Sequence, residues 1–417
     1  METKRVVIVG GGFAGLNAAM RLGRDSRVEV VVIDRRNYHL FQPLLYQVAT
    51  AALSPADIAV PIRSILAGFS NTRVLLDDVN AIDLKARSVK TSSESISYDY
   101  LILACGARHG YFAHPEWETF APGLKTVEQA TEIRRRILIA FELAERETDA
   151  EKLKALQTFI VVGAGPTGVE LAGAISEISR TTLERDFRRI DPARTRVILI
   201  EAGPRILASF SERLAKRAAR DLERLGVQIW TGSRVTDVGA DGVKLGAESI
   251  SAATVIWAAG VQPSHLGKEL GVALDPVGRV KVEPDLSLKE FPEVFVLGDQ
   301  ARVLGADGKA LPGLAPVAIQ EGRHAARNIR LSLSEKPRLS FHYIDKGQMA
   351  TIGRRRAIVQ TSGLEFGGML AWCAWLFVHI WYLIGFKNRF FVFLQWAWSY
   401  VTFRRGARLI VDKKWQI

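Results

Sequence analysis

Cysteine is scarce in this sequence, and its scarcity argues against two kinds of chemistry. Only Cys105 and Cys373 occur among 417 residues, and neither belongs to a Cys-x-x-Cys motif. A disulfide framework and a catalytic dithiol are therefore not expected, and a reducing compartment is indicated. We also predict no metal site.

The start of the chain lacks a recognisable targeting segment. Residues 1–5 lead directly into the apolar run Val6–Val9 and a glycine-rich turn, so a charged leader, an apolar region and a cleavage site do not fit there. We therefore expect the start of the chain to be part of the fold, and the bulk of the protein to stay in the cytoplasm.

Acidic residues almost vanish from the last 46 residues, where six of the nine Trp gather, at positions 372, 375, 381, 396, 398 and 415. A net charge of +12 is by itself compatible with nucleic acid, an anionic membrane or phosphorylated small molecules as partners. The clustering of Trp beside basic residues favours a lipid surface. Because no nucleic-acid motif is present, we expect no nucleic-acid partner.

The N-terminal part of the chain has the pattern of a strand–turn–helix–strand unit. An apolar strand over Arg5–Val9 precedes the turn Gly10–Gly15, a helix over Leu16–Leu22 and a second strand over Val28–Ile33, which ends at Asp34. This order, with its glycine-rich turn, is typical of dinucleotide-binding βαβ units.

The glycine spacing in this turn matches the needs of a pyrophosphate site. Gly10 permits the tight turn, Gly12 lets the backbone approach the phosphates, and Gly15 allows close packing of helix on strand. The free N–H groups of the helix N-terminus then face negative charge. Asp34 follows Gly15 by 19 residues, where a carboxylate can accept hydrogen bonds from a ribose hydroxyl.

A second unit of the same kind occupies the middle of the chain. It consists of the strand Phe159–Val162, the turn Gly163–Gly168, a helix over Val169–Ser179 and the strand Arg196–Ile200, which ends at Glu201. Two such units call for two dinucleotides, and the economical pair is a flavin with a nicotinamide.

The acid of the second unit predicts which nicotinamide is used. The charge of Glu201 would repel a 2′-phosphate, which favours NADH over NADPH, although Arg205 four residues later weakens that preference.

Further elements continue a doubly wound α/β fold. Apolar residues repeat at helical spacing over 214–225, and Gly226 is placed as the residue that ends this helix before the strand Val227–Trp230. The strand Val294–Leu297 precedes Asp299, and a helix begins near Pro316. We expect two Rossmann-like domains and a composition boundary near residue 340.

The last part of the chain predicts two amphipathic helices. Residues 366–386 carry no formal charge and are just long enough to span a bilayer. However, Trp372, Trp375, His379 and Tyr382 recur at helical spacing, which places interface-loving groups along one face. Residues 390–403 repeat this pattern with a polar stripe of Gln395, Ser399 and Thr402.

Helices that lie in the membrane interface therefore fit better than two crossings. Basic residues flank both helices and would meet anionic headgroups: Lys387, Arg389, Arg404, Arg405, Arg408, Lys413 and Lys414. The alternative is that this region forms a dimer interface or a buried helical pair.

Several segments together resemble one family over essentially the whole chain. These are the N-terminal fingerprint, Asn37–Gln47, Leu101–Ala107, Gly163–Gly173, Val294–Asp299 and Asp345–Gly353. The chain resembles the two-dinucleotide-binding-domain flavoproteins, and among them the type II NADH dehydrogenases, which are non-proton-pumping NADH:quinone oxidoreductases.

This resemblance implies an organisation and a setting. Residues 1–120 with 275–340 would bind FAD, 121–274 with a connecting helix would bind NADH, and 341–417 would anchor the protein to the membrane and mediate dimerisation. The expected protein passes hydride from NADH to FAD and two electrons to a membrane quinone. It would be a homodimer, bound peripherally and monotopically to an anionic lipid surface on the cytoplasmic side of the cell inner membrane.

The resemblance and the fingerprints together assign cofactor-binding residues by position. They are Gly10, Gly12, Phe13, Ala14, Gly15, Asp34, Arg35, Gln47, Val79, Ala104, Gly106, Asp299, Val317, Gly163, Gly165, Pro166, Thr167, Gly168, Glu201 and Gly260. By resemblance Asp299 would bond the ribityl chain of FAD, whereas the residue alone is also compatible with a helix cap. Cys105 is expected to be a small packing residue.

Three further residues are candidates for catalysis. Glu170 would help place or protonate a quinone, or would only compensate the helix dipole. Lys346 would stabilise developing negative charge, or would be a solvated turn residue. Gln320 matches the second glutamine of a quinone-site motif of the family, but Pro316 stands where the first is usual, which puts that pocket in doubt.

Other functions remain open at this point. A sulfide:quinone reductase would need paired cysteines, which are absent. A flavin reductase with a soluble acceptor is possible if the last helices are not an anchor, and a membrane-bound NADH sensor without turnover is the non-enzymatic alternative.

Overall fold

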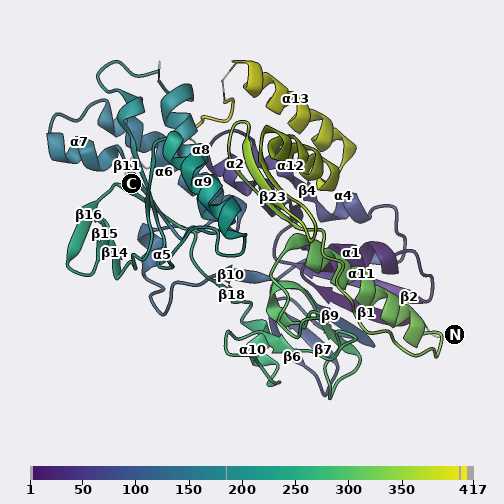
Figure 1. The fold of residues 1–417 in the computed structure, drawn as a ribbon. Helices are drawn as coiled ribbons and strands as arrows, with labels where there is room; N and C mark the ends of the chain where they lie inside the picture. The colour runs from purple at the N-terminus through teal and green to yellow at the C-terminus, as the bar shows by residue number, and fades with distance from the viewer. Residues whose placement is uncertain (1–2, 185, 403–404, 411–417) are drawn as a thin grey trace. The chain divides into compact units, whose positions relative to one another are not determined.

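The computed structural model describes residues 3–184, 186–402 and 405–410 of the chain. They form two compact units, each assembled from three separate segments. Unit 1 contains residues 1–40, 59–108 and 261–344, and unit 2 contains residues 41–58, 109–260 and 345–417. The chain therefore passes repeatedly from one unit to the other (Figure 1).

Unit 1 is built on a five-stranded parallel sheet with the strand order β20-β9-β1-β2-β5. The strands of this sheet are rich in Val, Ile and Leu, and its central strands are buried on both faces, as helix-covered parallel sheets require. The elements of this sheet and of its covering helices are β1 (Lys4–Val9), α1 (Phe13–Leu22), β2 (Val28–Asp34), β5 (Thr72–Leu76), β9 (Tyr100–Leu103), β20 (Val294–Val296) and α11 (Ala315–Ser332).

Helices α1 and α11 pack unusually closely in unit 1. A Cβ atom at Gly322 would lie 2.1 Å from the carbonyl oxygen of Ala14, so only glycine fits there. Smaller elements complete the unit: β3 (Tyr38–Leu40), β4 (Ala59–Pro61), α4 (Ile62–Leu66), β6 (Val79–Asp83), β7 (Ser88–Thr91), β8 (Ser95–Ser97), β18 (Val261–Pro263), α10 (Leu266–Glu269), β19 (Val280–Lys281) and β21 (Ala301–Arg302). Strand β10 (Ala107–His109) contains the point in the sequence, after residue 108, at which the chain passes from unit 1 to unit 2.

Unit 2 contains a four-stranded parallel sheet with the order β13-β12-β11-β17. This sheet and its neighbouring elements are α5 (Trp117–Phe120), α6 (Val127–Ala144), α7 (Ala150–Leu156), β11 (Thr158–Val162), α8 (Pro166–Glu177), β12 (Arg196–Ile200), α9 (Glu212–Arg224), β13 (Val227–Trp230), β14 (Asp237–Gly239), β15 (Gly242–Leu245), β16 (Glu248–Ser251) and β17 (Thr254–Trp257). The predicted repeat of the first unit's pattern is confirmed, and so is the end of α9 at Gly226, whose φ is +84°.

The remaining residues of unit 2 are its first and last segments. They form α2 (Leu45–Ala49), α3 (Pro55–Ile58), β22 (Gln348–Gly353), β23 (Arg356–Gln360), β24 (Glu365–Gly368), α12 (Met369–Tyr382) and α13 (Phe386–Thr402). Strand β22 packs on α8, and α12 packs on β23. Residues 345–417 thus share a unit with 109–260, while the three-part division expected from the sequence remains a prediction.

The two predicted C-terminal helices exist, but α12 faces the other way. Trp375 and His379 are buried and stack on each other with ring centroids 4.0 Å apart. The exposed side chains of α12 are apolar instead, and include Leu370, Phe377 and Trp381. This part of the expected interface stripe faces the protein, where His379 packs against Phe41 and Trp375 packs against Tyr46.

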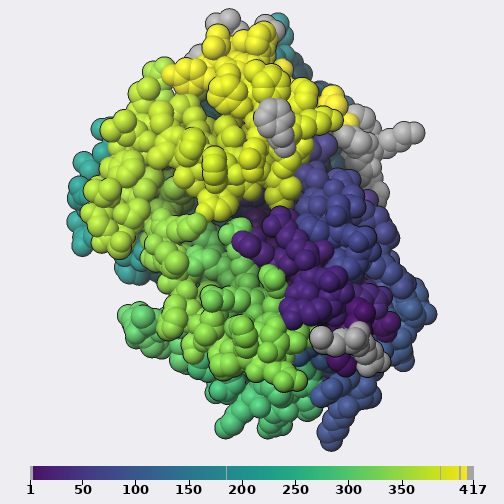
Figure 2. All heavy atoms as spheres, turned by 90° about the vertical axis from the view of Figure 1, so that its right-hand side faces the viewer, coloured from purple at the N-terminus to yellow at the C-terminus, as the bar shows by residue number. Residues whose placement is uncertain are grey.

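Helix α13 also turns a polar side chain toward the protein and large apolar side chains outward. Its polar Gln395 contacts Asp57, whereas its large exposed side chains are Phe390, Phe391, Phe393, Leu394, Trp398 and Val401. In Figure 2 the C-terminal part of the chain, in yellow-green and yellow, gathers on one side of the view. Among the described residues, no helix has both the length and the hydrophobicity to traverse a bilayer.

The basic residues around these helices are only partly free to meet a surface. Arg405 is nearly buried, 3.6 Å from Glu177, and Arg408 pairs with Asp186, so these two are corrected from headgroup contacts to internal ones. Lys387 is exposed, as predicted. Arg404, Lys413 and Lys414 lie outside the described residues.

Candidate active site

The glycine-rich turn of unit 1 has the geometry that the sequence predicts. Gly10 has φ +103°, and a Cβ there would lie 2.4 Å from the carbonyl oxygen of Ala104. A Cβ at Gly15 would lie 1.9 Å from the carbonyl oxygen of Gly10. At Gly12, by contrast, a Cβ would meet no atom within 4 Å. The first and third glycines are thus needed for packing, while the second faces open space where a pyrophosphate fits.

Asp34 closes this turn as well as ending its strand. One carboxylate oxygen accepts the Gly11 N–H at 2.6 Å and the other accepts the Arg36 N–H at 2.8 Å. Burial raises the pKa of Asp34, and these backbone N–H groups oppose that rise. Each carboxylate oxygen still has a free lone pair for a ribose hydroxyl.

A small cavity of about 20 Å³ in unit 1 brings two predicted residues together. Asp299 and Val317 line it, and Asp299 lies against Gly313, where a Cβ would be 2.9 Å from its carboxylate. Glu321 is a functional candidate that sequence reasoning missed. Its buried carboxylate accepts the Gly298 N–H at 2.6 Å, and burial, with the charge of Asp299, raises its pKa to about 7.

The glycine-rich turn of unit 2 repeats the first with the same contacts. Gly163 has φ +99°, and a Cβ there would lie 2.7 Å from the Ala259 nitrogen. A Cβ at Gly165 would meet nothing within 4 Å. Glu201 accepts the Ala164 N–H at 2.8 Å and the Gly203 N–H at 2.7 Å, just as Asp34 does in unit 1. Both cradles are therefore complete and equivalent.

The other predicted cofactor-binding residues are distributed over both units. Phe13, Ala14, Pro166, Thr167 and Gly168 belong to the first turns of α1 and α8. Val79 and Ala104 are buried in unit 1, and Arg35 is exposed. Gly106 and Gly260 both have positive φ, +67° and +72°. Gln47 belongs to unit 2, where its amide contacts Tyr46 and Trp396.

Cys105 is half-buried, and its role as a small packing residue stays a prediction. Burial raises the pKa of its thiol to about 12, so the thiol stays protonated at physiological pH. Its Sγ lies 3.6 Å from the Val9 carbonyl oxygen.

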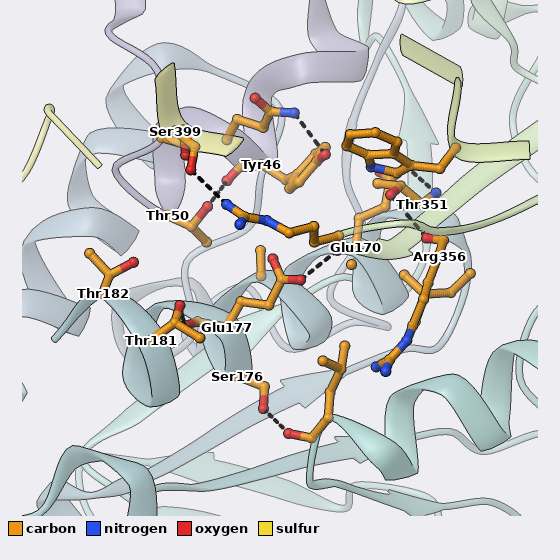
Figure 3. Close-up of a pocket in the computed structure, with 18 of the residues that line it drawn as sticks. Tyr46, Thr50, Glu170, Ser176, Glu177, Thr181, Thr182, Thr351, Arg356 and Ser399 are labelled. Carbon is orange, nitrogen blue, oxygen red and sulfur yellow. Dashed lines mark hydrogen bonds between the residues drawn. The ribbon is translucent and has the colours of Figure 1, made fainter. Parts of the chain in front are cut away.

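Unit 2 contains a cavity of about 540 Å³ that the sequence did not predict (Figure 3). Its walls come from α2, α8, β22, α12 and α13, which are far apart along the chain. Its lining includes large apolar and aromatic side chains, among them Trp372, Trp375, Leu376, Trp396 and Tyr400. It also includes charged side chains: Glu170, Glu177, Arg180, Glu223, Arg224, Arg354, Arg356 and Arg405.

Glu170 is the most perturbed acid of this cavity. Among the described residues its carboxylate has one weak hydrogen-bond partner, the Thr351 N–H at 3.4 Å (Figure 3). Burial raises its pKa to about 8, so it is largely protonated at neutral pH. Burial of the neighbouring Tyr46 keeps the pKa of its hydroxyl well above the usual value, and Glu170 adds to this rise when it is ionised. A protonated carboxyl in an aromatic-walled cavity is suited to donate a proton.

Glu177 lies two turns further along the same helix, and its surroundings differ. Its carboxylate accepts the Arg354 N–H and lies 3.6 Å from the guanidinium of Arg405. The side chain of Arg354 in turn donates to the carbonyls of Ser399 and Tyr400 at the end of α13. This group ties α8 to the C-terminal helix.

The two other catalytic candidates are placed elsewhere. Gln320 belongs to unit 1 and exchanges two hydrogen bonds of 3.0 Å with the backbone of Ile344. Lys346 is exposed in unit 2, donates to the Tyr382 hydroxyl at 3.0 Å, and does not line the cavity. Pro316 lies in the first turn of α11, as predicted.

Comparisons with known proteins agree with this architecture. Residues 4–322 match the family model "Pyridine nucleotide-disulphide oxidoreductase", and residues 346–405 match "NDH2 C-terminal domain". Two Mycobacterium tuberculosis proteins, the type II NADH:quinone oxidoreductases Ndh and NdhA, are 44% and 45% identical, each over 98% of this chain and over 91% and 90% of their own lengths.

Solved structures agree on the fold. NDH2 from Plasmodium falciparum, solved in complex with NADH, has a TM-score of 0.88 at 19% identity and covers 99% of this chain and 100% of its own. The sulfide:quinone oxidoreductase of Aquifex aeolicus has a TM-score of 0.72 at 20% identity, with 93% of this chain and 92% of its own covered.

Proposed function

This chain belongs to the type II NADH:quinone oxidoreductases, and from that premise we propose that it oxidises NADH and reduces a quinone, with FAD as its cofactor. Bound FAD supplies the two-electron carrier between nicotinamide and quinone. The observation that carries this proposal is the pair of complete pyrophosphate cradles, each closed by an acid at the end of the adjacent strand.

The residues present fit the two dinucleotides. In unit 1 the open face at Gly12 and the N-terminus of α1 would hold the FAD pyrophosphate, and Asp34 its ribose. In unit 2, Gly165 and Glu201 would do the same for NADH. Asp299, Val317 and the remaining predicted residues are proposed to complete these sites.

We propose that the cavity of unit 2 receives the quinone. The aromatic side chains that line it, including Trp372, Trp375 and Trp396, suit a flat ring with an apolar tail. Its volume of about 540 Å³ lies in the range of small-molecule binding sites. Quinone reduction consumes two protons with two electrons, and Glu170, protonated at neutral pH, is the proposed donor of one. Lys346 and Gln320 do not line this cavity, so their roles in stabilising charge and placing a quinone stay predictions from the sequence alone.

We also propose that the exposed faces of α12 and α13 lie on an anionic lipid surface, as a monotopic anchor on the cytoplasmic side of the inner membrane. Their exposed aromatic and aliphatic side chains, including Phe377, Trp381 and Trp398, are the kind that insert at the headgroup level. Exposed Lys387 and Arg389 would add attraction. A homodimer is proposed in addition, on family resemblance.

The test uses the purified full-length protein. It should carry a flavin absorption spectrum that NADH bleaches and that added quinone restores, with steady quinone-dependent NADH oxidation. A colourless protein that takes up no FAD would overturn the proposal. Bleaching with only slow turnover would favour a sensor, and full activity toward a protein acceptor without lipid would favour a soluble-acceptor reductase.

A further inference from the structure

A strained turn lies beside the second cradle. Residues Tyr111–His114 form a four-residue turn in which the His114 N–H donates to the Tyr111 carbonyl at 2.9 Å. Both central residues have positive φ, +47° at Phe112 and +71° at Ala113, as in a type I′ turn. Such turns normally use Asn-Gly or Gly-Gly, because a Cβ in this conformation costs about 1–2 kcal/mol per residue.

The first of these two strained residues carries an exposed aromatic ring. Phe112 is 65% exposed, while Tyr111 and Trp257 beside it are buried. The flanking backbone is held rigidly, since the Trp257 indole N–H donates to the Gly110 carbonyl and the Tyr111 hydroxyl donates to that of Ala121, both at 3.0 Å. A large apolar side chain is thus held outward, at a cost in backbone strain and in exposed apolar surface. Such local conflicts are expected at functional positions.

The ring lies at the rim of the second cradle. A Cβ at Gly260 would be 3.0 Å from the Cζ atom of Phe112, so the ring covers this glycine directly. The residue before it, Ala259, is the one that Gly163 of the cradle approaches closely. Within unit 2, Phe112 is therefore connected through Gly260 and Ala259 to Gly163 of the cradle.

The strand order shows which half of the dinucleotide meets this ring. In the order β13-β12-β11-β17, Glu201 ends β12 on one side of the cradle strand β11, and Gly260 follows β17 on the other side. A pyrophosphate at Gly165 with the adenosine ribose at Glu201 directs the other half of the molecule toward β17. That half is the nicotinamide riboside.

We propose that Phe112 is a substrate-binding residue whose ring packs against the nicotinamide riboside half of NADH. The inference rests on the proposed function and adds a residue to it. Packing of this ring on the ribose and nicotinamide orders the reactive end of the substrate, whereas Glu201 recognises the adenosine end. Asn-Gly at positions 112 and 113 would relieve the backbone strain of this turn, but it would also remove the aromatic ring. The need for the ring therefore accounts for the strained residues.

The test measures equilibrium binding by calorimetry to the flavin-loaded full-length protein. The probes are NAD⁺ and ADP, which shares only the adenosine and pyrophosphate half. Phe112→Ala should weaken NAD⁺ binding roughly 3- to 12-fold, the effect of losing one aromatic packing contact, and leave ADP binding within about twofold. Phe112→Tyr, which keeps the ring, should bind NAD⁺ like the wild type.

Leu364→Ala is the matched control, because Leu364 is equally exposed in unit 2 and lies in a turn between β23 and β24. It should change neither affinity. Unchanged NAD⁺ binding by Phe112→Ala, or equal weakening of NAD⁺ and ADP, would overturn the proposal, the second by showing general damage to the cradle. A wild type that binds no NAD⁺ would instead refute the proposed function, and this inference with it.

Discussion

Replacing Glu170 by Gln should change how the stability of the protein depends on pH. Burial raises the pKa of Glu170 from 4.5 to about 8. The native state therefore binds a proton that the unfolded state releases between these two values. Stability contributed at this position is highest below the unfolded pKa and falls as pH rises toward the folded pKa.

The magnitude follows from the two pKa values. The difference corresponds to at most about 5 kcal/mol, lost at about 1.4 kcal/mol per pH unit. Glutamine keeps the shape and cannot ionise, so Glu170→Gln should lose this dependence. For a chain of this length about 1 kcal/mol corresponds to about 1 °C in Tm, so the Tm advantage of the variant should grow by about 3 °C between pH 5.5 and 8.

The assay is thermal unfolding of the flavin-loaded protein across that pH range, for the wild type and the variant. Glu177→Gln is the matched control, because it removes a carboxylate from the same helix and the same cavity, but one with Arg405 beside it. Parallel Tm curves for the wild type and Glu170→Gln would show that Glu170 ionises normally and would refute the reasoning. Quinone reduction should fall about 10²- to 10⁴-fold in the variant if Glu170 donates a proton.

Three further predictions concern other sites. Glu201→Ala should raise the preference for NADPH over NADH about 10-fold, measured as the ratio of kcat/KM values, because a charge facing the 2′-phosphate is removed; an unchanged ratio would contradict this. Trp381→Ser should weaken cosedimentation with anionic vesicles about 10-fold, whereas Leu76→Ser, an equally exposed apolar position in unit 1, should not. Glu321→Gln should gain Tm relative to the wild type progressively from about pH 4.5 to 7 and keep a constant advantage above pH 7, because burial raises the pKa of Glu321 from 4.5 to about 7; the same Tm difference at pH 4.5 and pH 7 would argue against its burial.

The two cradles were predictable from the sequence because their determinants are local. Glycines at fixed spacing and an acid at the end of the next strand specify the turn within about 40 residues of chain. The same reasoning found the start of α11 at Pro316 and the end of α9 at Gly226. Each of these signals acts within a turn or two of helix.

The cavity of unit 2 was beyond that reasoning. Its walls come from residues near 46, 170, 352, 375 and 400, and no periodicity relates segments so far apart. The predicted orientation of α12 was wrong for a related reason. Trp375 and His379 look like interface residues in isolation, and only packing against Tyr46 and Phe41 shows that they are internal. Glu321 was missed because a buried acid on an apolar helix face carries no motif.

The carboxylates that close the two glycine-rich turns have one more consequence. Asp34 and Glu201 accept hydrogen bonds from the backbone of the glycine-rich turns. Each pyrophosphate site is therefore preorganised before a nucleotide binds, and binding has to order little of the loop. The same carboxylate oxygens that hold the backbone of the turn would also bind the ribose of the nucleotide. Removing either acid should therefore destabilise the nucleotide-free turn as well as weaken nucleotide binding.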